Sequence, residues 1–159
     1  MSISDKSKLD QWRLANYPNQ VKAVPWQNYH VTIAFLGNVH CEEIDTVVDS
    51  VIALQKPYVA VTFDRLGFWQ KPRAFWLGCS RCPDELNQYA HQVAKQVVKL
   101  GYKKPHKHYN PHVTLIRGVK SELPAPLQAP EFTFEFNEIT LFESVSTAKG
   151  VKYVPLIQF

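Results

Sequence analysis

Two short segments of the chain repeat a histidine and a threonine at the same spacing. They are HVTI, starting at His30, and HVTL, starting at His112. In an extended strand, residues two apart point to the same face, so each copy would present an imidazole beside the hydroxyl of Thr32 or Thr114. Two such pairs facing each other would supply a general acid, a general base and two hydroxyl donors around one small anion. This is the equipment for opening or forming a phosphodiester without a metal ion.

The alternative interpretation is that both histidines only satisfy hydrogen bonds within their strands. The context of the two copies argues against it, because each has valine at its second position, an aliphatic residue at its fourth and a glycine close behind. The repeat therefore predicts a site rather than a coincidence of composition.

The composition is that of a mildly basic globular protein. The 159 residues carry a net charge of +4, and 45% of them are hydrophobic, so we expect one domain or two small lobes that share a core. The charge suits an anionic substrate without identifying a nucleic-acid binder. No apolar run is long enough to span a membrane, and the polar N-terminal segment does not resemble a secretory signal.

The cysteines predict a reducing compartment. The chain has 3 of them, and an odd number without a secretory context indicates reduced thiols and a cytoplasmic location. The CxxC at 79–82 is isolated, and a zinc site would need a second pair of ligands at suitable spacing. An incidental pair at the end of a strand is the favoured interpretation.

The order of predicted elements favours the α+β class. Apolar periodicity predicts helices over 5–17, 41–55 and 84–100, with Gly101 as a cap for the last. Strands are predicted over 28–37, 58–69, 73–79, 111–117, 131–143 and 151–158. Short hairpin-like connections indicate antiparallel pairing. Because each half carries one motif strand and one long helix, we expect two pseudo-symmetric lobes of antiparallel sheet, with helices outside and both motif strands in a central cleft.

Four stretches of the chain resemble a known family. They are HVTIAFLG at 30–37, GFWQKPRAFWLG at 67–78, PHVTLIRG at 111–118 and ITLFESVSTAKGVKYVPL at 139–156. They are similar to the two-histidine phosphoesterases and, within that superfamily, to the RNA 2',3'-cyclic phosphodiesterases, also called 2'-5' RNA ligases. The resemblance implies a single two-lobed domain over 1–159. Family members usually begin with a short apolar strand of the R-x-F-x-A type that is absent here, which would leave a sheet edge exposed.

The resemblance implies a metal-independent reaction without a cofactor. A 2',3'-cyclic phosphate on an RNA end or a small nucleotide would be hydrolysed to a 2'-phosphate, with 2'-5' ligation as the reverse reaction. By analogy, His30 is the general acid and His112 the general base, although the sequence leaves these roles interchangeable. Thr32 and Thr114 would hydrogen-bond the phosphate oxygens, and Arg117 would pair with the phosphate. In a regular strand, residue 117 would face away from residue 112, so this role requires a bulge or a strand end.

Further substrate contacts are less sharply defined. Aromatic residues that could stack on a nucleobase are Phe35, Trp69, Phe75 and Tyr109, with core packing as the alternative for each. Basic residues that could contact an RNA backbone are Lys103, Lys104, Lys107 and Arg73, with a solvated basic surface as the alternative.

Three other functions remain open at the level of sequence. The same site could act on ADP-ribose cyclic phosphate or a linear 2',5' linkage, or work mainly as a ligase. A metal-dependent hydrolase could use His106, His108 and His112, although no acidic residue lies nearby to complete such a site. A non-catalytic RNA-binding module is the least favoured. The expected partners are RNA ends or nucleotides with a 2',3'-cyclic phosphate rather than a membrane, and a monomer is favoured.

Overall fold

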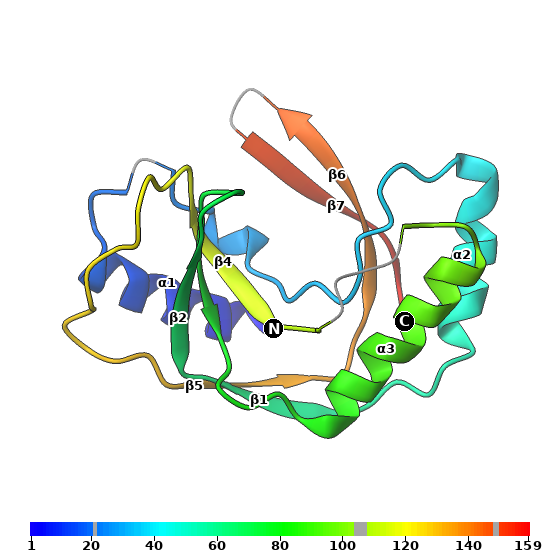
Figure 1. The fold of residues 1–159 in the computed structure, drawn as a ribbon, viewed down its shortest axis with the longest axis horizontal. Helices are drawn as coiled ribbons and strands as arrows, with labels where there is room; N and C mark the ends of the chain where they lie inside the picture. The colour runs from blue at the N-terminus through cyan, green and yellow to red at the C-terminus, as the bar shows by residue number, and fades with distance from the viewer. Residues whose placement is uncertain (21, 104–107, 148–149) are drawn as a thin grey trace. The chain divides into compact units, whose positions relative to one another are not determined.

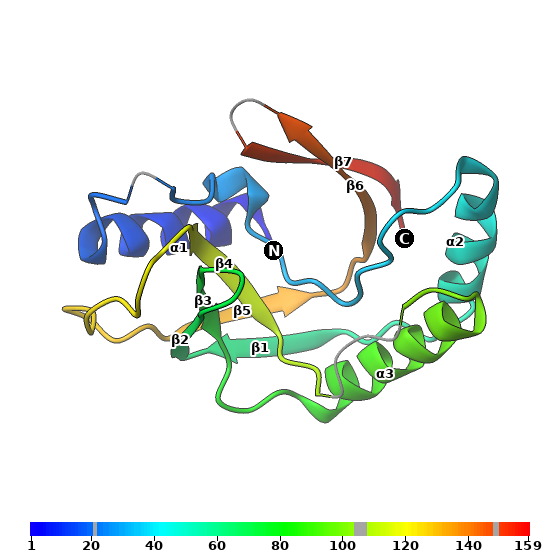
Figure 2. The same ribbon diagram turned by 45° about the horizontal axis from the view of Figure 1, so that its top comes forward.

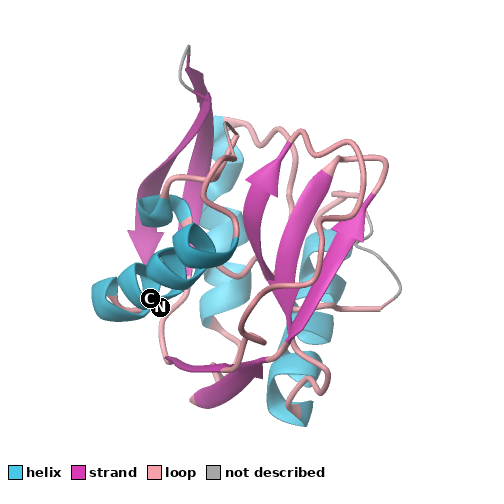
Figure 3. Cartoon of the chain, turned by 90° about the vertical axis from the view of Figure 1, so that its left-hand side faces the viewer, coloured by secondary structure: helices cyan, strands magenta, loops and turns pink. Residues whose placement is uncertain are grey.

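The computed structural model describes residues 1–20, 22–103, 108–147 and 150–159, and it combines helices with antiparallel strands (Figures 1 and 3). The helices are α1 (Ile3–Asn16), α2 (Ile44–Ile52) and α3 (Asp84–Lys99), with short 3-10 turns η1 (Trp26–Asn28) and η2 (Cys41–Glu43). The strands are β1 (Val59–Phe63), β2 (Arg65–Trp69), β3 (Ala74–Gly78), β4 (His112–Arg117), β5 (Phe132–Phe136), β6 (Thr140–Thr147) and β7 (Gly150–Gln158). The predicted α+β class is confirmed. Among the helices of the described residues, none is long and apolar enough to cross a membrane.

The chain forms two compact units, each assembled from three segments. Unit 1 comprises residues 1–32, 60–82 and 110–135, and unit 2 comprises residues 33–59, 83–109 and 136–159. Both His30 and His112 belong to unit 1. The two units do not correspond to the two halves of the sequence, because each unit joins segments that are distant in sequence.

The central sheet of unit 1 is antiparallel, with strand order β2-β3-β4, and β1 pairs separately with β5. All of β3 is buried. Residues 22–24 run along the other edge of β4, where Ala23 forms a bridge with Ile116 and the Val24 N–H donates to the Leu115 carbonyl at 2.8 Å. The motif strand β4 is thus held from both edges, which fixes the direction of its side chains.

Helix α1, near the N-terminus of the chain, packs against this sheet. A capping box between Ser2 and Asp5 starts the helix, because each side chain satisfies a backbone N–H that the helix leaves unpaired. The Trp12 indole donates to the Gln128 carbonyl at 3.0 Å, and the ring of Tyr17, at the end of the helix, lies 5.1 Å from the ring of Phe75 on β3. The helix therefore packs through side chains on the Phe75 side of the sheet.

Unit 2 pairs two helices with a long hairpin. Val51 of α2 packs against Tyr89, Val93 and Val97 of α3, and the two helices lie side by side (Figure 2). Gly101 follows α3 with a φ of +89°, the left-handed conformation that glycine adopts most easily, as its prediction as a cap requires. Strands β6 and β7 form the antiparallel hairpin.

Three predicted strands differ from the structure. No strand is formed over 28–37; instead Ile33 and Leu36 pack against the α2–α3 cluster of unit 2, so their burial comes from helices rather than from a neighbouring strand. The predicted strand 58–69 divides at Asp64, whose side chain accepts hydrogen bonds from the backbone and hydroxyl of Ser80. The predicted strand 131–143 is also interrupted, between Phe136 and Thr140.

Candidate active site

Strand β4 presents three predicted site residues on one face of its sheet. Consecutive residues of β3 pair with Thr114 and Ile116, so Leu115 is the extra residue of a bulge. Leu115 and Ile116 are both buried, which reverses the alternation after Thr114. Arg117 therefore returns to the face that carries His112 and Thr114. The bulge that the role of Arg117 required is present.

An aromatic pair supports this face beside the second motif. The Trp76 ring on β3 covers Gly67 and Gly78, and a Cβ atom at either glycine would overlap it. Trp69 lies against Trp76, with ring centroids 5.0 Å apart, and meets the His112 ring at 4.5 Å and 80°. The His112 imidazole is thus held edge to face by a tryptophan that itself rests on a second one. Trp69, predicted to stack on a base, is half-buried and contacts the catalytic candidate directly.

Both motif histidines are oriented by the same local hydrogen bond. The Nδ1 of His30 donates to the Asn28 carbonyl at 2.6 Å, and the Nδ1 of His112 donates to the Asn110 carbonyl at 2.8 Å. A carbonyl can only accept, so the proton sits on Nδ1, and Nε2 is the nitrogen that exchanges protons with a ligand. The repeated motif is therefore N-x-H-V-T. The asparagine two positions before each histidine is a sequence signal that the His-x-Thr pattern did not include.

The two imidazoles share an electrostatic environment. Burial lowers the pKa of His30 below its ordinary value of 6.5, and the positive charges of Lys6, His112 and Arg117 lower it further, against the opposing hydrogen bond to Asn28. Burial also lowers the pKa of His112, and Arg117 again contributes. Arg117 thus acts on both histidines. In the free protein, both shifts favour the uncharged imidazole.

These shifts predict where the reaction slows with pH. A mechanism that needs one neutral and one protonated histidine depends on the pKa values of both side chains. Both pKa values are lowered from 6.5 in the free protein. We expect kcat/KM to be highest on the acid side of 6.5 and to fall as the pH rises, because the protonated imidazole is then lost. We expect the profile of kcat to lie at higher pH, since a bound phosphate anion favours the protonated form. Initial rates across the pH range, at low and at saturating substrate, test both statements, and coincident profiles would contradict them.

Thr32 and Thr114 are both half-buried members of unit 1. Within the part of the chain that the structure describes, no hydrogen bond is made by either hydroxyl. Each hydroxyl can therefore donate to a ligand without breaking an existing bond. Their role as phosphate contacts stays a prediction.

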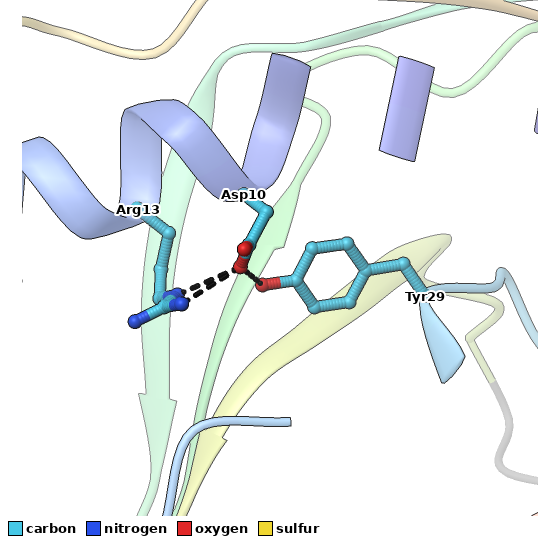
Figure 4. Close-up of polar contacts among 3 residues, drawn as sticks. All are labelled: Asp10, Arg13 and Tyr29. Carbon is cyan, nitrogen blue, oxygen red and sulfur yellow. Dashed lines mark hydrogen bonds and ion pairs between the residues drawn. The ribbon is translucent and has the colours of Figure 1, made fainter. Parts of the chain in front are cut away.

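The first motif is anchored to α1 through a buried polar network. The Tyr29 hydroxyl donates to Asp10 Oδ1 at 3.0 Å, and the Arg13 guanidinium donates to the same oxygen at 3.1 and 2.8 Å (Figure 4). Tyr29 is fully buried; burial and the Asp10 charge raise the pKa of its hydroxyl well above the ordinary value. Because Tyr29 directly precedes His30, this network fixes the backbone from which the His30 imidazole projects.

The other aromatic residues named as candidates for base stacking differ in burial. Phe75 is 2% exposed and contacts Tyr17, so it is a core residue, which was the alternative to base stacking for this side chain. Phe35, which is 69% exposed, and the half-buried Tyr109 belong to unit 2. Their stacking roles stay predictions.

The predicted backbone contacts are only partly described. Arg73 and Lys103 are exposed, as a contact with RNA would require. Lys104 and Lys107 lie outside the described residues, as does His106 of the metal-site alternative. In the described ranges, no three His, Cys, Asp or Glu side chains group as ligands for a metal ion.

Comparisons with known proteins show the family of this chain. The chain is 27% identical over 152 residues to the RNA 2',3'-cyclic phosphodiesterase of Escherichia coli (strain K12), covering 95% of this chain and 86% of that protein. It is 30% identical over 152 residues to the RNA 2',3'-cyclic phosphodiesterase of Aquifex aeolicus (strain VF5), covering 87% and 80%. The crystal structure of E. coli LigT complexed with 3'-AMP superimposes with a TM-score of 0.90 at 26% identity, covering 100% of this chain and 92% of that one. A sequence model of the 2'-5' RNA ligase superfamily matches residues 2–148. The chain belongs to this superfamily.

Proposed function

We propose that this protein is a metal-independent RNA 2',3'-cyclic phosphodiesterase, which hydrolyses the cyclic phosphate of an RNA end or nucleotide to a 2'-phosphate. The observation that carries the proposal is the matched pair of histidines, each with Nδ1 bonded to a backbone carbonyl and each influenced by the charge of Arg117. The curated relatives named RNA 2',3'-cyclic phosphodiesterase support the same activity.

The reaction needs one proton removed and one proton supplied. His112, neutral, takes a proton from water through Nε2 while the water oxygen forms a new bond to phosphorus. The bond from phosphorus to the 3' oxygen breaks, and His30, protonated, gives its Nε2 proton to that oxygen. The 2' oxygen keeps the phosphate. In 2'-5' ligation, the 5' hydroxyl of a second RNA takes the place of water, the same bond to the 3' oxygen breaks, and the two histidines keep their roles. They exchange roles in the reverse of ligation, when the 3' hydroxyl attacks the phosphorus of a 2'-5' linkage and releases the 5' hydroxyl.

The phosphate would be held by the groups around the histidines. Arg117 supplies a permanent charge for the developing negative charge of the transition state, and the Thr32 and Thr114 hydroxyls donate to its non-bridging oxygens. Binding of the anion also raises the pKa of the acid histidine toward neutrality. A histidine that is uncharged in the free protein can therefore be protonated when the substrate is bound.

The first test is turnover in the presence of a chelator. Purified protein with EDTA should convert a nucleoside 2',3'-cyclic phosphate, and a short RNA ending in one, into the 2'-phosphate alone. A mixture of 2' and 3' products, or activity that disappears in EDTA and returns with a divalent metal, would overturn the mechanism. ADP-ribose cyclic phosphate and a linear 2',5' linkage belong on the same panel, because faster turnover of either would reassign the substrate.

We also propose that residues 1–159 act as one phosphoesterase domain, since the family match spans segments of both units. A cytoplasmic location is supported by the cysteines, because Cys41, Cys79 and Cys82 form no disulfide in the described structure. A monomer is the proposed state, and its mass in solution would test it.

A further inference from the structure

Lys6 of α1 is fixed against the turn that leads into the first motif. Its Nζ donates to the Gln27 carbonyl at 2.9 Å, and the next carbonyl along the chain, that of Asn28, accepts the Nδ1 bond of His30 at 2.6 Å. Adjacent carbonyls of η1 therefore hold the ammonium and the imidazole. The ammonium cannot move far from His30 without giving up this bond.

The charge of Lys6 has no counter-charge in its surroundings. Lys6 is half-buried as a residue, and burial lowers the pKa of its ammonium. The part of the chain that the structure describes contains no ion-pair partner for it. One of its three N–H groups bonds to Gln27, which leaves two donors for another acceptor. Partial burial of an unpaired cation is unfavourable, and an anionic ligand would relieve this cost.

The charge of Lys6 affects the pKa of His30 alone, whereas the charge of Arg117 affects the pKa of both histidines. The positive charge of Lys6 is the largest charge effect that opposes protonation of His30, while at His112 this effect comes from Arg117. The phosphate that reacts between the histidines is thus already matched by Arg117. An anion at Lys6 would be a second group of the substrate, on the His30 side of the reacting phosphate.

We propose that Lys6 forms a second phosphate subsite, which binds the phosphodiester of the nucleotide next to the cyclic end, so that the protein prefers oligonucleotide ends to mononucleotides. This inference rests on the proposed function. In a nucleic-acid strand, charged phosphates follow one another at about 3.4 Å per nucleotide along the axis of a duplex, so a neighbouring phosphate is the nearest second anion on such a substrate. A lysine ammonium binds phosphate as a point charge.

The test compares two substrates that share the same reacting end. They are a nucleoside 2',3'-cyclic phosphate and a trinucleotide that ends in it. Wild-type protein should show the higher kcat/KM with the trinucleotide. Lys6→Gln keeps an amide donor for the Gln27 carbonyl but removes the charge, and it should reduce kcat/KM about 10-fold to 100-fold with the trinucleotide. With the mononucleotide the loss should stay below about 3-fold.

Two further variants separate binding from structure. Lys6→Arg keeps the charge and should keep the preference for the trinucleotide. Lys8→Gln removes an exposed lysine of the same helix and should change neither value. Equal losses of Lys6→Gln with both substrates, or no loss with either, would overturn the subsite. Wild-type protein that turns over neither substrate would instead overturn the proposed function on which the subsite depends.

Discussion

His112→Ala and His30→Ala are each expected to lower kcat by about 100-fold to 10,000-fold, the usual contribution of a positioned acid or base. Each variant removes one of the two proton carriers, and water replaces it without the orientation that the carbonyl of Asn28 or Asn110 imposes on the imidazole. The double variant should be little slower than the slower single variant, because residues that act as a unit are not additive. Single-turnover rates with a nucleoside 2',3'-cyclic phosphate measure the effect.

The matched control is His91→Ala. His91 also bonds its Nδ1 to a backbone carbonyl, that of Asn87 at 2.7 Å, but it lies exposed on α3. Its removal should leave kcat unchanged. Wild-type activity in either motif variant, with the thermal transition intact, would refute the two-histidine mechanism.

Asp10→Ala is expected to destabilise the protein by about 3 to 5 kcal/mol, the cost of leaving a buried charge without its partner. The side chains of Arg13 and Asp10 are only 8% and 16% exposed, and Asp10 Oδ1 also accepts the hydroxyl proton of Tyr29. The substitution therefore removes the acceptor of an arginine and of a tyrosine at once. Urea unfolding at neutral pH measures the free energy of unfolding.

Two controls separate the ion pair from the rest of the network. Tyr29→Phe keeps the pair and loses one hydroxyl donor, so it should cost about 1 kcal/mol. Asp49→Ala alters an exposed aspartate of α2 and should stay within about 0.5 kcal/mol of wild type. If Asp10→Ala is no more destabilising than Tyr29→Phe, the Arg13–Asp10 pair within α1 adds nothing to stability beyond the hydrogen bond to Tyr29.

The sequence by itself determined the elements whose pattern is local. The helix predicted over 84–100 forms as Asp84–Lys99, because apolar periodicity and a terminal glycine are properties of consecutive residues. The two His-x-Thr repeats identified the histidines that share one compact unit. The alternation of side chains along a strand also shows, from sequence alone, that Arg117 can share the face of His112 only if the strand contains a bulge or ends.

The tertiary structure decided which surfaces meet. The apolar pattern after His30 predicts buried side chains but not what buries them, and packing on α2 and α3 took the place of a paired strand. Lys6 and Asp10 carry no signal in their own neighbourhoods. Each gains its place from a partner distant in sequence, Gln27 and Tyr29 respectively. Such contacts exist only once the chain has closed on itself, because local propensities do not encode which distant residues are brought together.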